Sequence, residues 1–364
     1  MNPLKQLQEY RQSVWIDNLS RHLIVSGELQ RLIVEDNVTG LTSNPAIFEK
    51  AIDDSTDYDD AVRKLRDADA GIDAAGIYER LSVEDIRMAA DILRPVYEDA
   101  GGGDGYASIE VSPHLSNDSA GSVAEARRLW QAVDRPNVMV KIPATAAGIP
   151  AIESLLAEGI NINITLMFSQ AHYEAVAGAF LRGAARCPDI RKIYSVASIF
   201  VSRVDTLIDP ALEAIGTPEA LALRGKIATA NAKIIYQKFR EIFYGEPFAE
   251  LRKRDVRVQR VLWGSTGTKN PAYSDVLYVE ELVGPDTINT MPLPTLAAFK
   301  AHGQVRGTTV QEGIGAARAS LENLKTLGID LKAATEKLQK DGVAAFSSSL
   351  DKLLANLDKK RRSR

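Results

Sequence analysis

Short β-rich segments recur eight times along the chain, and stretches of helical character lie between successive ones. Strands that alternate with helices pair in parallel, because each helix returns the chain to the end at which the previous strand began. Eight such units predict an α/β fold closed into a (β/α)8 or TIM barrel rather than an open sheet. The eight segments are 13–17, 40–44, 106–112, 137–143, 161–168, 192–198, 258–265 and 286–291.

The segments between these strands carry helix signals. A Ser-Asn-Asp cluster precedes a helical stretch at 120–133, and Ser169 opens an alanine-rich amphipathic stretch that reaches residue 185. Thr217 is followed by Pro218, the order of an N-cap and a first helical residue. This pair predicts a helix that continues towards Tyr244.

Additional helices are expected outside the barrel repeat. The longest insertion, 53–105, lies between the second and third strands, is mostly helical in character and ends in a glycine-rich turn. After the eighth strand, 309–327 and 330–357 predict two more helices. The last of these has apolar residues at helical spacing and therefore a face to bury. That face is formed by Val343, Phe346, Leu350, Leu353 and Leu357.

The length of the chain fits this fold. It has 364 residues, which is long for an ordinary domain but normal for such a barrel with extra helices. No repeat and no Pro/Ser-rich linker divides it, so we expect 1–364 to form a single domain. The basic run at its end, 358–364, is expected to be a disordered tail, because short terminal charge blocks are usually frayed.

Composition excludes several classes of protein. Hydrophobic residues make up 45% and charged residues 25%, which predicts a large packed core. The net charge is −4 and no basic stripe is present, so a nucleic-acid partner is not expected. No apolar run reaches the ~20 residues of a membrane span, and the first residues lack the layout of a signal peptide.

The thiol and imidazole groups predict neither a disulfide nor a metal site. A single cysteine, Cys187, excludes an intrachain disulfide and fits a reducing, cytoplasmic setting. The four histidines stand far apart, without the spacing of metal ligands, so no metal site is expected. The histidines are His22, His114, His172 and His302.

The fifth predicted strand alternates between apolar and polar residues. Its isoleucines and Leu166 form one face, whereas Asn161, Asn163 and Thr165 form the other. Helices cover the outside of a barrel, so the polar face is expected to point inward. Three buried polar groups need partners. A structural network with water would supply them, and so would a polar reaction chamber, which explains the pattern better.

A lysine interrupts the apolar fourth strand. Lys141 lies near the carboxyl end of this strand, where the active sites of such barrels are found. An amine that is partly desolvated there is a nucleophile towards carbonyl compounds. A structural ion pair with a neighbouring strand is the alternative.

Two carboxylates occupy equivalent places on other strands. Asp17 ends the first strand and Glu110 lies on the third. Each could simply neutralise Lys141. Two acids around one lysine also supply the proton donors and acceptors that carbinolamine formation and C–C cleavage require.

At these residues the sequence resembles the transaldolase family over nearly its whole length. The segment Gly-Ile-Asn-Ile-Asn-Ile-Thr-Leu at 159–166 is the most specific match. The others are Trp-Ile-Asp-Asn at 15–18, Leu-Thr-Ser-Asn-Pro at 41–45, Ile-Glu-Val-Ser at 109–112, Val-Lys-Ile-Pro-Ala-Thr at 140–145 and Ser-Ile-Phe-Val-Ser-Arg at 198–203.

The resemblance implies a transferase of the pentose phosphate pathway that needs no cofactor. Such an enzyme moves a dihydroxyacetone unit from sedoheptulose 7-phosphate or fructose 6-phosphate to glyceraldehyde 3-phosphate or erythrose 4-phosphate. Lys141 would form the Schiff base with C2 of the donor. Glu110 and Thr165 would hold the water that shuttles protons, and Asp17 would take the C4 hydroxyl proton.

The resemblance also implies substrate-binding residues. Asn44 and Asn163 would bind the hydroxyls of the dihydroxyacetone unit, and Thr42 belongs to the same matching segment as Asn44. Ser198 and Arg203 would line the site towards the phosphate.

Near the phosphate the sequence departs from the family. Relatives carry an arginine closely after a serine that follows the seventh strand. Here Ser265 matches, but the arginine is missing and Lys269 is the nearest cation. The insertion at 53–105 and the loop at 268–275 resemble the longer bacterial and plant-type branch.

Two other functions are compatible with the sequence. One is an aldolase that releases free dihydroxyacetone, like the small fructose-6-phosphate aldolases, which are much shorter and lack the carboxylate at Glu110. The other is a non-catalytic barrel that binds sugar phosphates, which would have no use for a desolvated amine.

The resemblance is also compatible with a homo-oligomer, since the family includes monomers, dimers and larger rings.

Overall fold

The computed structural model describes residues 2–53, 55–189, 191 and 193–362. Its eight parallel strands close into a barrel in which each strand pairs with the next and β8 pairs with β1. The predicted (β/α)8 fold is therefore confirmed. The strands are β1 (Gln12–Asp17), β2 (Val38–Thr42), β3 (Tyr106–Glu110), β4 (Val138–Pro143), β5 (Ile162–Met167), β6 (Ser195–Phe200), β7 (Arg260–Gly264) and β8 (Thr287–Met291). The sixth strand was predicted to begin at residue 192, whereas β6 begins at Ser195. Residue 192 itself lies outside the described residues.

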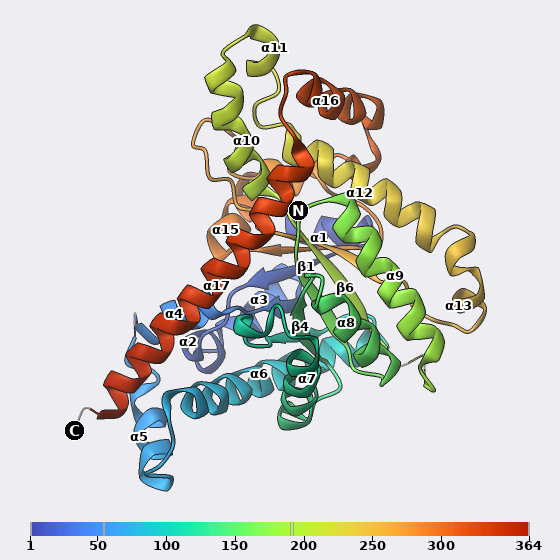
Figure 1. The fold of residues 1–364 in the computed structure, drawn as a ribbon. Coiled ribbons are helices and arrows are strands. Elements are labelled where there is room, and N and C mark those ends of the chain that lie inside the picture. The colour runs from blue at the N-terminus through green and yellow to red at the C-terminus, as the bar shows by residue number, and fades with distance from the viewer. Residues whose placement is uncertain (1, 54, 190, 192, 363–364) are drawn as a thin grey trace.

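Helices surround the barrel (Figure 1). Among the described residues, no helix combines the length and the apolar character needed to cross a membrane. The helices are α1 (Pro3–Glu9), α2 (Arg21–Val25), α3 (Glu28–Asp36), α4 (Pro45–Asp53), α5 (Asp59–Ala68), α6 (Ala74–Asp99), η1 (Pro113–Leu115), α7 (Ser119–Val133), α8 (Gly148–Ala157), α9 (Gln170–Arg186), α10 (Ser202–Ile215), α11 (Pro218–Leu221), α12 (Ile227–Phe243), η3 (Glu246–Phe248), α13 (Ala249–Lys253), α14 (Leu277–Glu281), α15 (Leu293–His302), η4 (Thr309–Gln311), α16 (Ile314–Thr326) and α17 (Leu331–Arg362).

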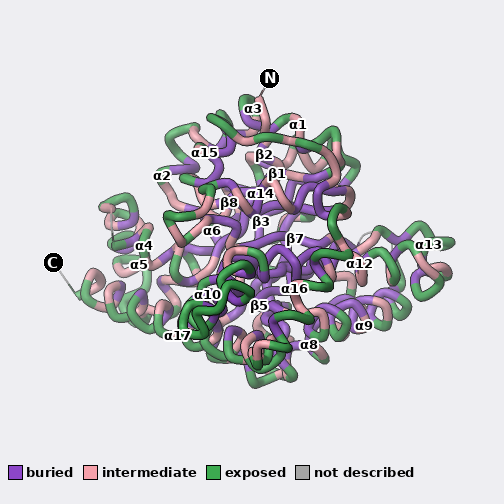
Figure 2. Tube along the Cα trace, turned by 90° about the horizontal axis from the view of Figure 1, so that it is seen from above, coloured by how far each residue is buried: buried purple, intermediate pink, exposed green. Residues whose placement is uncertain are grey.

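Two apolar layers hold the barrel together. The larger one lies between the strands and the helices, so that buried residues gather in the centre of Figure 2. A smaller cluster fills the amino-terminal part of the barrel, where the rings of Tyr106 and Tyr194 stack with centroids 4.8 Å apart. Because this apolar cluster fills that part of the interior, a polar cavity can form only nearer the carboxyl ends of the strands. Its members are Trp15, Tyr106, Met139, Tyr194, Val196, Leu262 and Ile288.

The helix predicted from Thr217 towards Tyr244 is divided into α11 and α12. Thr217 does cap α11, since its side chain accepts a hydrogen bond from the amide of Ala220. The chain then turns through 222–226, where Gly225 has a φ of +67°. Two carboxylates of α10 hold this turn, because Asp209 accepts from the amide of Gly225 and Asp205 from that of Ala228. The expectation of one continuous helix was therefore wrong.

The predicted helical insertion and C-terminal helices are present, but the basic end differs from expectation. Residues 358–362 belong to α17, so the disordered tail was wrong there, and 363–364 lie outside the described residues. Charge complementarity explains the order. Lys360 pairs with Asp59 of α5 at 2.6 Å, and Arg361 donates to the carbonyl of Ile72 at 3.1 Å. In Figure 1, α17 runs past the barrel and along α4.

Candidate active site

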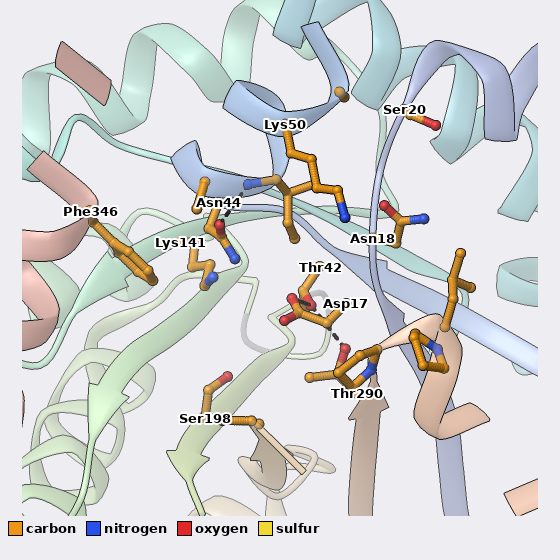
Figure 3. A pocket seen from close by; sticks show the side chains of 18 of the residues that line it. Asp17, Asn18, Ser20, Thr42, Asn44, Lys50, Lys141, Ser198, Thr290 and Phe346 are labelled. Carbon is orange, nitrogen blue, oxygen red and sulfur yellow. Dashed lines mark hydrogen bonds between the residues drawn. The ribbon is translucent and has the colours of Figure 1, made fainter. Parts of the chain in front are cut away.

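A cavity of about 750 Å³ lies at the carboxyl ends of the strands (Figure 3). Eight of the eleven residues predicted for the site line it, although they come from five different strands and the segments that follow them. Glu110, Asn163 and Thr165 are not among the lining residues. The eight are Asp17, Thr42, Asn44, Lys141, Ser198, Arg203, Ser265 and Lys269.

Lys141 is the most enclosed cation of the cavity. It is 3% exposed, and its Nζ lies 3.2 Å from Oε2 of Glu110. The ammonium also donates a hydrogen bond to the carbonyl of Ser43 at 3.0 Å. The Phe346 ring of α17 lies on another side, with its centroid 5.8 Å from Nζ. These contacts fix the amine at the cavity wall.

Glu110 is placed beside Lys141 by strand register. The two residues are direct partners in the pairing of β3 with β4. Burial raises the pKa of Glu110, the charge of Lys141 opposes this effect, and the charge of Asp17 adds to it. A carboxyl group with a raised pKa beside an amine is suited to carry a proton to and from the reaction centre.

Asp17 is oriented from the next strand. Thr42, its partner in the pairing of β1 with β2, donates a hydrogen bond to Oδ1 of Asp17 at 2.8 Å. Thr42 also shares a hydrogen bond of 2.9 Å with Thr290 of β8, and the three side chains form one cluster in Figure 3. The carboxylate is thereby held at the cavity surface, on the floor formed by β1, β2 and β8.

Asn44 lies beside Lys141 in Figure 3 and belongs to the turn into α4. Its Oδ1 accepts a hydrogen bond from the amide of Ile47 at 3.0 Å. This bond restricts the side chain and leaves its amide nitrogen as a donor near the amine of Lys141.

A second polar row lies on β5 and its neighbours. Ser198 donates to Oδ1 of Asn163 at 2.7 Å, and Asn163 donates to Ser108 at 3.1 Å. The strand pairing places Asn163 directly beside Lys141. Thr165 is fully buried, and among the described residues its hydroxyl has no hydrogen-bond partner.

Asn161, the third polar residue of this row, has a structural role. Its Nδ2 donates to the carbonyls of Pro136 and Val138, and its Oδ1 accepts from the amide of Tyr194. These bonds connect the backbones that lead into β4 and β6. The expectation that all three polar side chains face a reaction chamber was therefore wrong for Asn161. This residue lies just before β5, and its side chain bonds to the backbones of the neighbouring segments instead of facing the cavity.

The cations Arg203 and Lys269 line the cavity together with Ser265. Burial lowers the pKa of Arg203, while the charge of Asp17 counteracts it. The Arg203 guanidinium lies 5.1 Å from the centroid of Phe200. Ser265 has a φ of +52°, and its hydroxyl shares a hydrogen bond of 2.9 Å with that of Ser202. This side of the cavity offers fixed positive charge and hydroxyl donors.

Several lining residues were not predicted from the sequence. Lys50 of α4 contributes a further cation, Thr290 positions Thr42, and Phe346 arrives from α17. Phe346 was visible only as part of a helix face to be buried, and nothing in the sequence indicated what that face would meet. Among residues 2–53, 55–189, 191 and 193–362, no group of three or more His, Cys, Asp or Glu side chains is arranged to hold a metal ion.

Comparisons with known proteins agree with this geometry. The family model described as "Transaldolase/Fructose-6-phosphate aldolase" matches residues 14–357. A protein of Thiobacillus denitrificans named "Transaldolase" is 47% identical over 98% of this chain and 100% of its own length. Proteins of Thermobifida fusca, "Transaldolase", and Streptomyces coelicolor, "Transaldolase 1", are also 47% identical, over 97% and 98% of this chain and 96% and 94% of theirs.

A solved structure titled a putative fructose-1,6-biphosphate aldolase, from Coccidioides immitis, aligns with 96% of this chain and 93% of its own. Its TM-score is 0.29 at 9% identity, too low to support an argument. The assignment of the barrel fold is therefore based on the strand pairing, and the assignment to a family is based on the family model and the full-length relatives. On these grounds the chain belongs to the transaldolase/fructose-6-phosphate aldolase family.

Proposed function

We propose that the protein is a transaldolase, which moves a dihydroxyacetone unit from a ketose phosphate to an aldose phosphate through a Schiff base on Lys141. One observation carries the proposal. A buried lysine lies 3.2 Å from a carboxylate of raised pKa, at the wall of a cavity that a second carboxylate, Asp17, also lines. The names of the full-length relatives support it.

The first step joins the donor to the protein. The neutral amine of Lys141 attacks C2 of the ketose, and the carbinolamine loses its hydroxyl as water to give an iminium ion. This sequence needs a group that accepts a proton from the amine and returns one to the leaving hydroxyl. Glu110 performs both transfers, and a water between Glu110 and the unpaired hydroxyl of Thr165 relays the proton.

The second step breaks the C3–C4 bond. Asp17 removes the proton from the C4 hydroxyl, whose oxygen becomes the carbonyl oxygen of the departing aldose. The electron pair of the C3–C4 bond moves into the iminium, which becomes an enamine and acts as the electron sink. The hydrogen bond from Thr42 keeps the acceptor oxygen of Asp17 oriented for this transfer.

The third step reverses the second with a different aldehyde. C3 of the enamine attacks the carbonyl carbon of the acceptor, and Asp17 returns its proton to the new C4 oxygen. Water then adds to C2 of the iminium, the C2–N bond breaks, and Lys141 is free for another cycle.

Polar side chains hold the substrates during these steps. Asn44 and Ser198 line the cavity and contact the hydroxyls of the three-carbon unit, and Asn163 supports this contact through its hydrogen bond with Ser198. Arg203, Ser265 and Lys269 bind the phosphate. The planar guanidinium orients it, whereas the lysine attracts it as a point charge.

We infer that residues 1–364 act as one domain in the cytoplasm, in which the insertion and α17 pack against each other beside the closed barrel. The contacts of α17 with α4, α5 and α6 and the single buried cysteine support this view.

A coupled assay tests the proposed function. Fructose 6-phosphate and erythrose 4-phosphate should yield glyceraldehyde 3-phosphate at a rate that depends on both substrates. Release of glyceraldehyde 3-phosphate that is equally fast without erythrose 4-phosphate would identify an aldolase instead. Saturable binding of fructose 6-phosphate with no product at all would identify a binding protein.

A further inference from the structure

The C-terminal helix α17 places one aromatic side chain over the amine of Lys141. Phe346 is 4% exposed and lines the active-site cavity, and its ring centroid lies 5.8 Å from Nζ of Lys141. Figure 3 shows the ring extending from α17 towards the lysine. Among the described residues of α17, only Phe346 lines this cavity.

Contacts with the barrel fix the first half of α17. The side-chain nitrogen of Gln339 donates to the carbonyls of Ala144 and Leu166, 3.0 Å from each, where β4 and β5 end. One turn on, Gly342 packs so closely that an added Cβ would lie 2.8 Å from the side chain of Leu166. Phe346 follows one turn later, so the backbone that carries its ring is held directly against the strand ends.

The second half of α17 is fixed to the insertion. Asn356 donates to both carboxylate oxygens of Asp53 at 2.7 and 2.8 Å, and Lys360 and Arg361 contact α5 and the loop after it. Leu350 and Leu353, one and two turns after Phe346, are buried in the apolar core. The helix is thus held on both sides of Phe346, and the ring is a fixed part of the cavity wall.

We propose that Phe346 shields the covalent intermediate on Lys141 from water and so favours transfer over release of the three-carbon unit. This inference rests on the proposed function. After C3–C4 cleavage the enamine has two fates. Its C3 either attacks an acceptor aldehyde, or it takes a proton and regenerates an iminium. Water then adds to C2 of that iminium, the C2–N bond breaks, and free dihydroxyacetone leaves.

The aromatic ring acts on this choice in two ways. Its bulk keeps bulk water from approaching the C2–N bond along the α17 side of the cavity. Its π-face also stabilises the positive charge of the iminium, and such an interaction is stronger in a desolvated site. Both effects slow the addition of water to the dihydroxyacetone iminium, which can then lose its C3 proton, return to the enamine and react with an acceptor. Neither effect requires Phe346 to exchange a proton or form a bond.

The ratio of dihydroxyacetone release to transfer measures this role. With fructose 6-phosphate as donor and erythrose 4-phosphate as acceptor, we expect Phe346→Ala to raise the ratio about tenfold. This is in the range of a lost cation–π contact. Phe346→Leu should raise it less, because it keeps apolar bulk and loses only the ring. Leu350→Ala is the matched control, since Leu350 is equally buried at 4% on the same helix but does not line the cavity. Its ratio should remain that of the native protein.

Failure of the proposed function and failure of the inference about Phe346 give different results. If the native protein forms no borohydride-trapped adduct on Lys141, the proposed function fails and this inference falls with it. If the adduct forms and transfer proceeds, but neither Phe346 variant changes the ratio, only this inference is overturned. An equal rise in Leu350→Ala would also overturn it, because general loosening of α17 would then explain the effect. Where Phe346→Ala does not fold, Phe346→Leu decides, since it preserves most of the volume.

Discussion

Glu110 and Lys141 are direct partners on β3 and β4, and their side chains meet inside the barrel with charged atoms 3.2 Å apart. Each side chain is at most 5% exposed, so bulk water has little access to the pair. Asp17, on β1, lines the cavity beside Thr42, and its charge contributes to the raised pKa of Glu110. Glu110 forms the ion pair with Lys141, whereas Asp17 accepts a hydrogen bond from Thr42, so we expect the two carboxylates to serve different steps.

The division of labour between the acids is testable by amide substitutions. Asp17→Asn should still form the trapped adduct on Lys141 but cleave the C3–C4 bond slowly, whereas Glu110→Gln should slow formation of the adduct itself. Each defect should amount to about 10²–10⁴-fold, the usual contribution of general acid–base groups. Rapid mixing followed by borohydride quenching separates the steps. The same defect at the same step in both variants would contradict the assignment.

A separate prediction concerns the residues proposed to bind the phosphate of the substrate. Arg203→Ala should raise KM for phosphorylated donors by about 10–100-fold, the effect of losing a charge-assisted hydrogen bond. Unphosphorylated dihydroxyacetone should be almost unaffected. Lys269→Ala should act in the same direction more weakly, with a loss that shrinks as salt rises. Steady-state kinetics at two ionic strengths provide the measurement. Unchanged KM in both variants would place the phosphate elsewhere in the cavity, with Lys50 as the remaining lining lysine.

Asp205 on α10 should make stability depend on pH. Burial raises its pKa to about 6, although it accepts hydrogen bonds from Ala228 and Tyr278. The folded state therefore binds this proton more tightly than the unfolded state. The resulting stabilisation is fully present below pH ~4 and is lost as pH rises through about 6, amounting to up to ~3 kcal/mol. Urea unfolding of the native protein and Asp205→Asn should show stability curves that diverge between these values. Parallel curves would show that Asp205 is not protonated more readily in the fold.

Gly40 on β2 tests the packing of the barrel interior. A Cβ at this position would lie 2.4 Å from the Trp15 ring, which is itself fully buried. Gly40→Ala should therefore cost about 1–3 kcal/mol of unfolding free energy through overpacking. Gly315→Ala in α16, where an added Cβ meets nothing within 4 Å, should instead be neutral or stabilising. Chemical denaturation compares the two, and equal stability in both variants would show that the Trp15 site relaxes freely.

The sequence predicted the barrel because its signal is repeated: eight strands and the helices between them agree with one topology. It also located Asp17, Glu110 and Lys141, since charges within apolar strands stand out against their surroundings. The break between α11 and α12 was not predictable, because it depends on carboxylates of α10 that approach only in the folded state. Phe346 and Lys50 were missed for a related reason. Each lies on a helix whose own pattern gives no indication of the cavity it will face.

Borohydride reduction in the presence of fructose 6-phosphate, followed by peptide mass mapping, is the most direct test of the Schiff base on Lys141. We predict a single dihydroxyacetone-derived adduct on the peptide that contains Lys141. Lys141→Met should abolish both the adduct and the transfer activity while the circular dichroism spectrum of the barrel persists. An adduct on Lys269, Lys50 or any other lysine, or full activity in Lys141→Met, would contradict the mechanism.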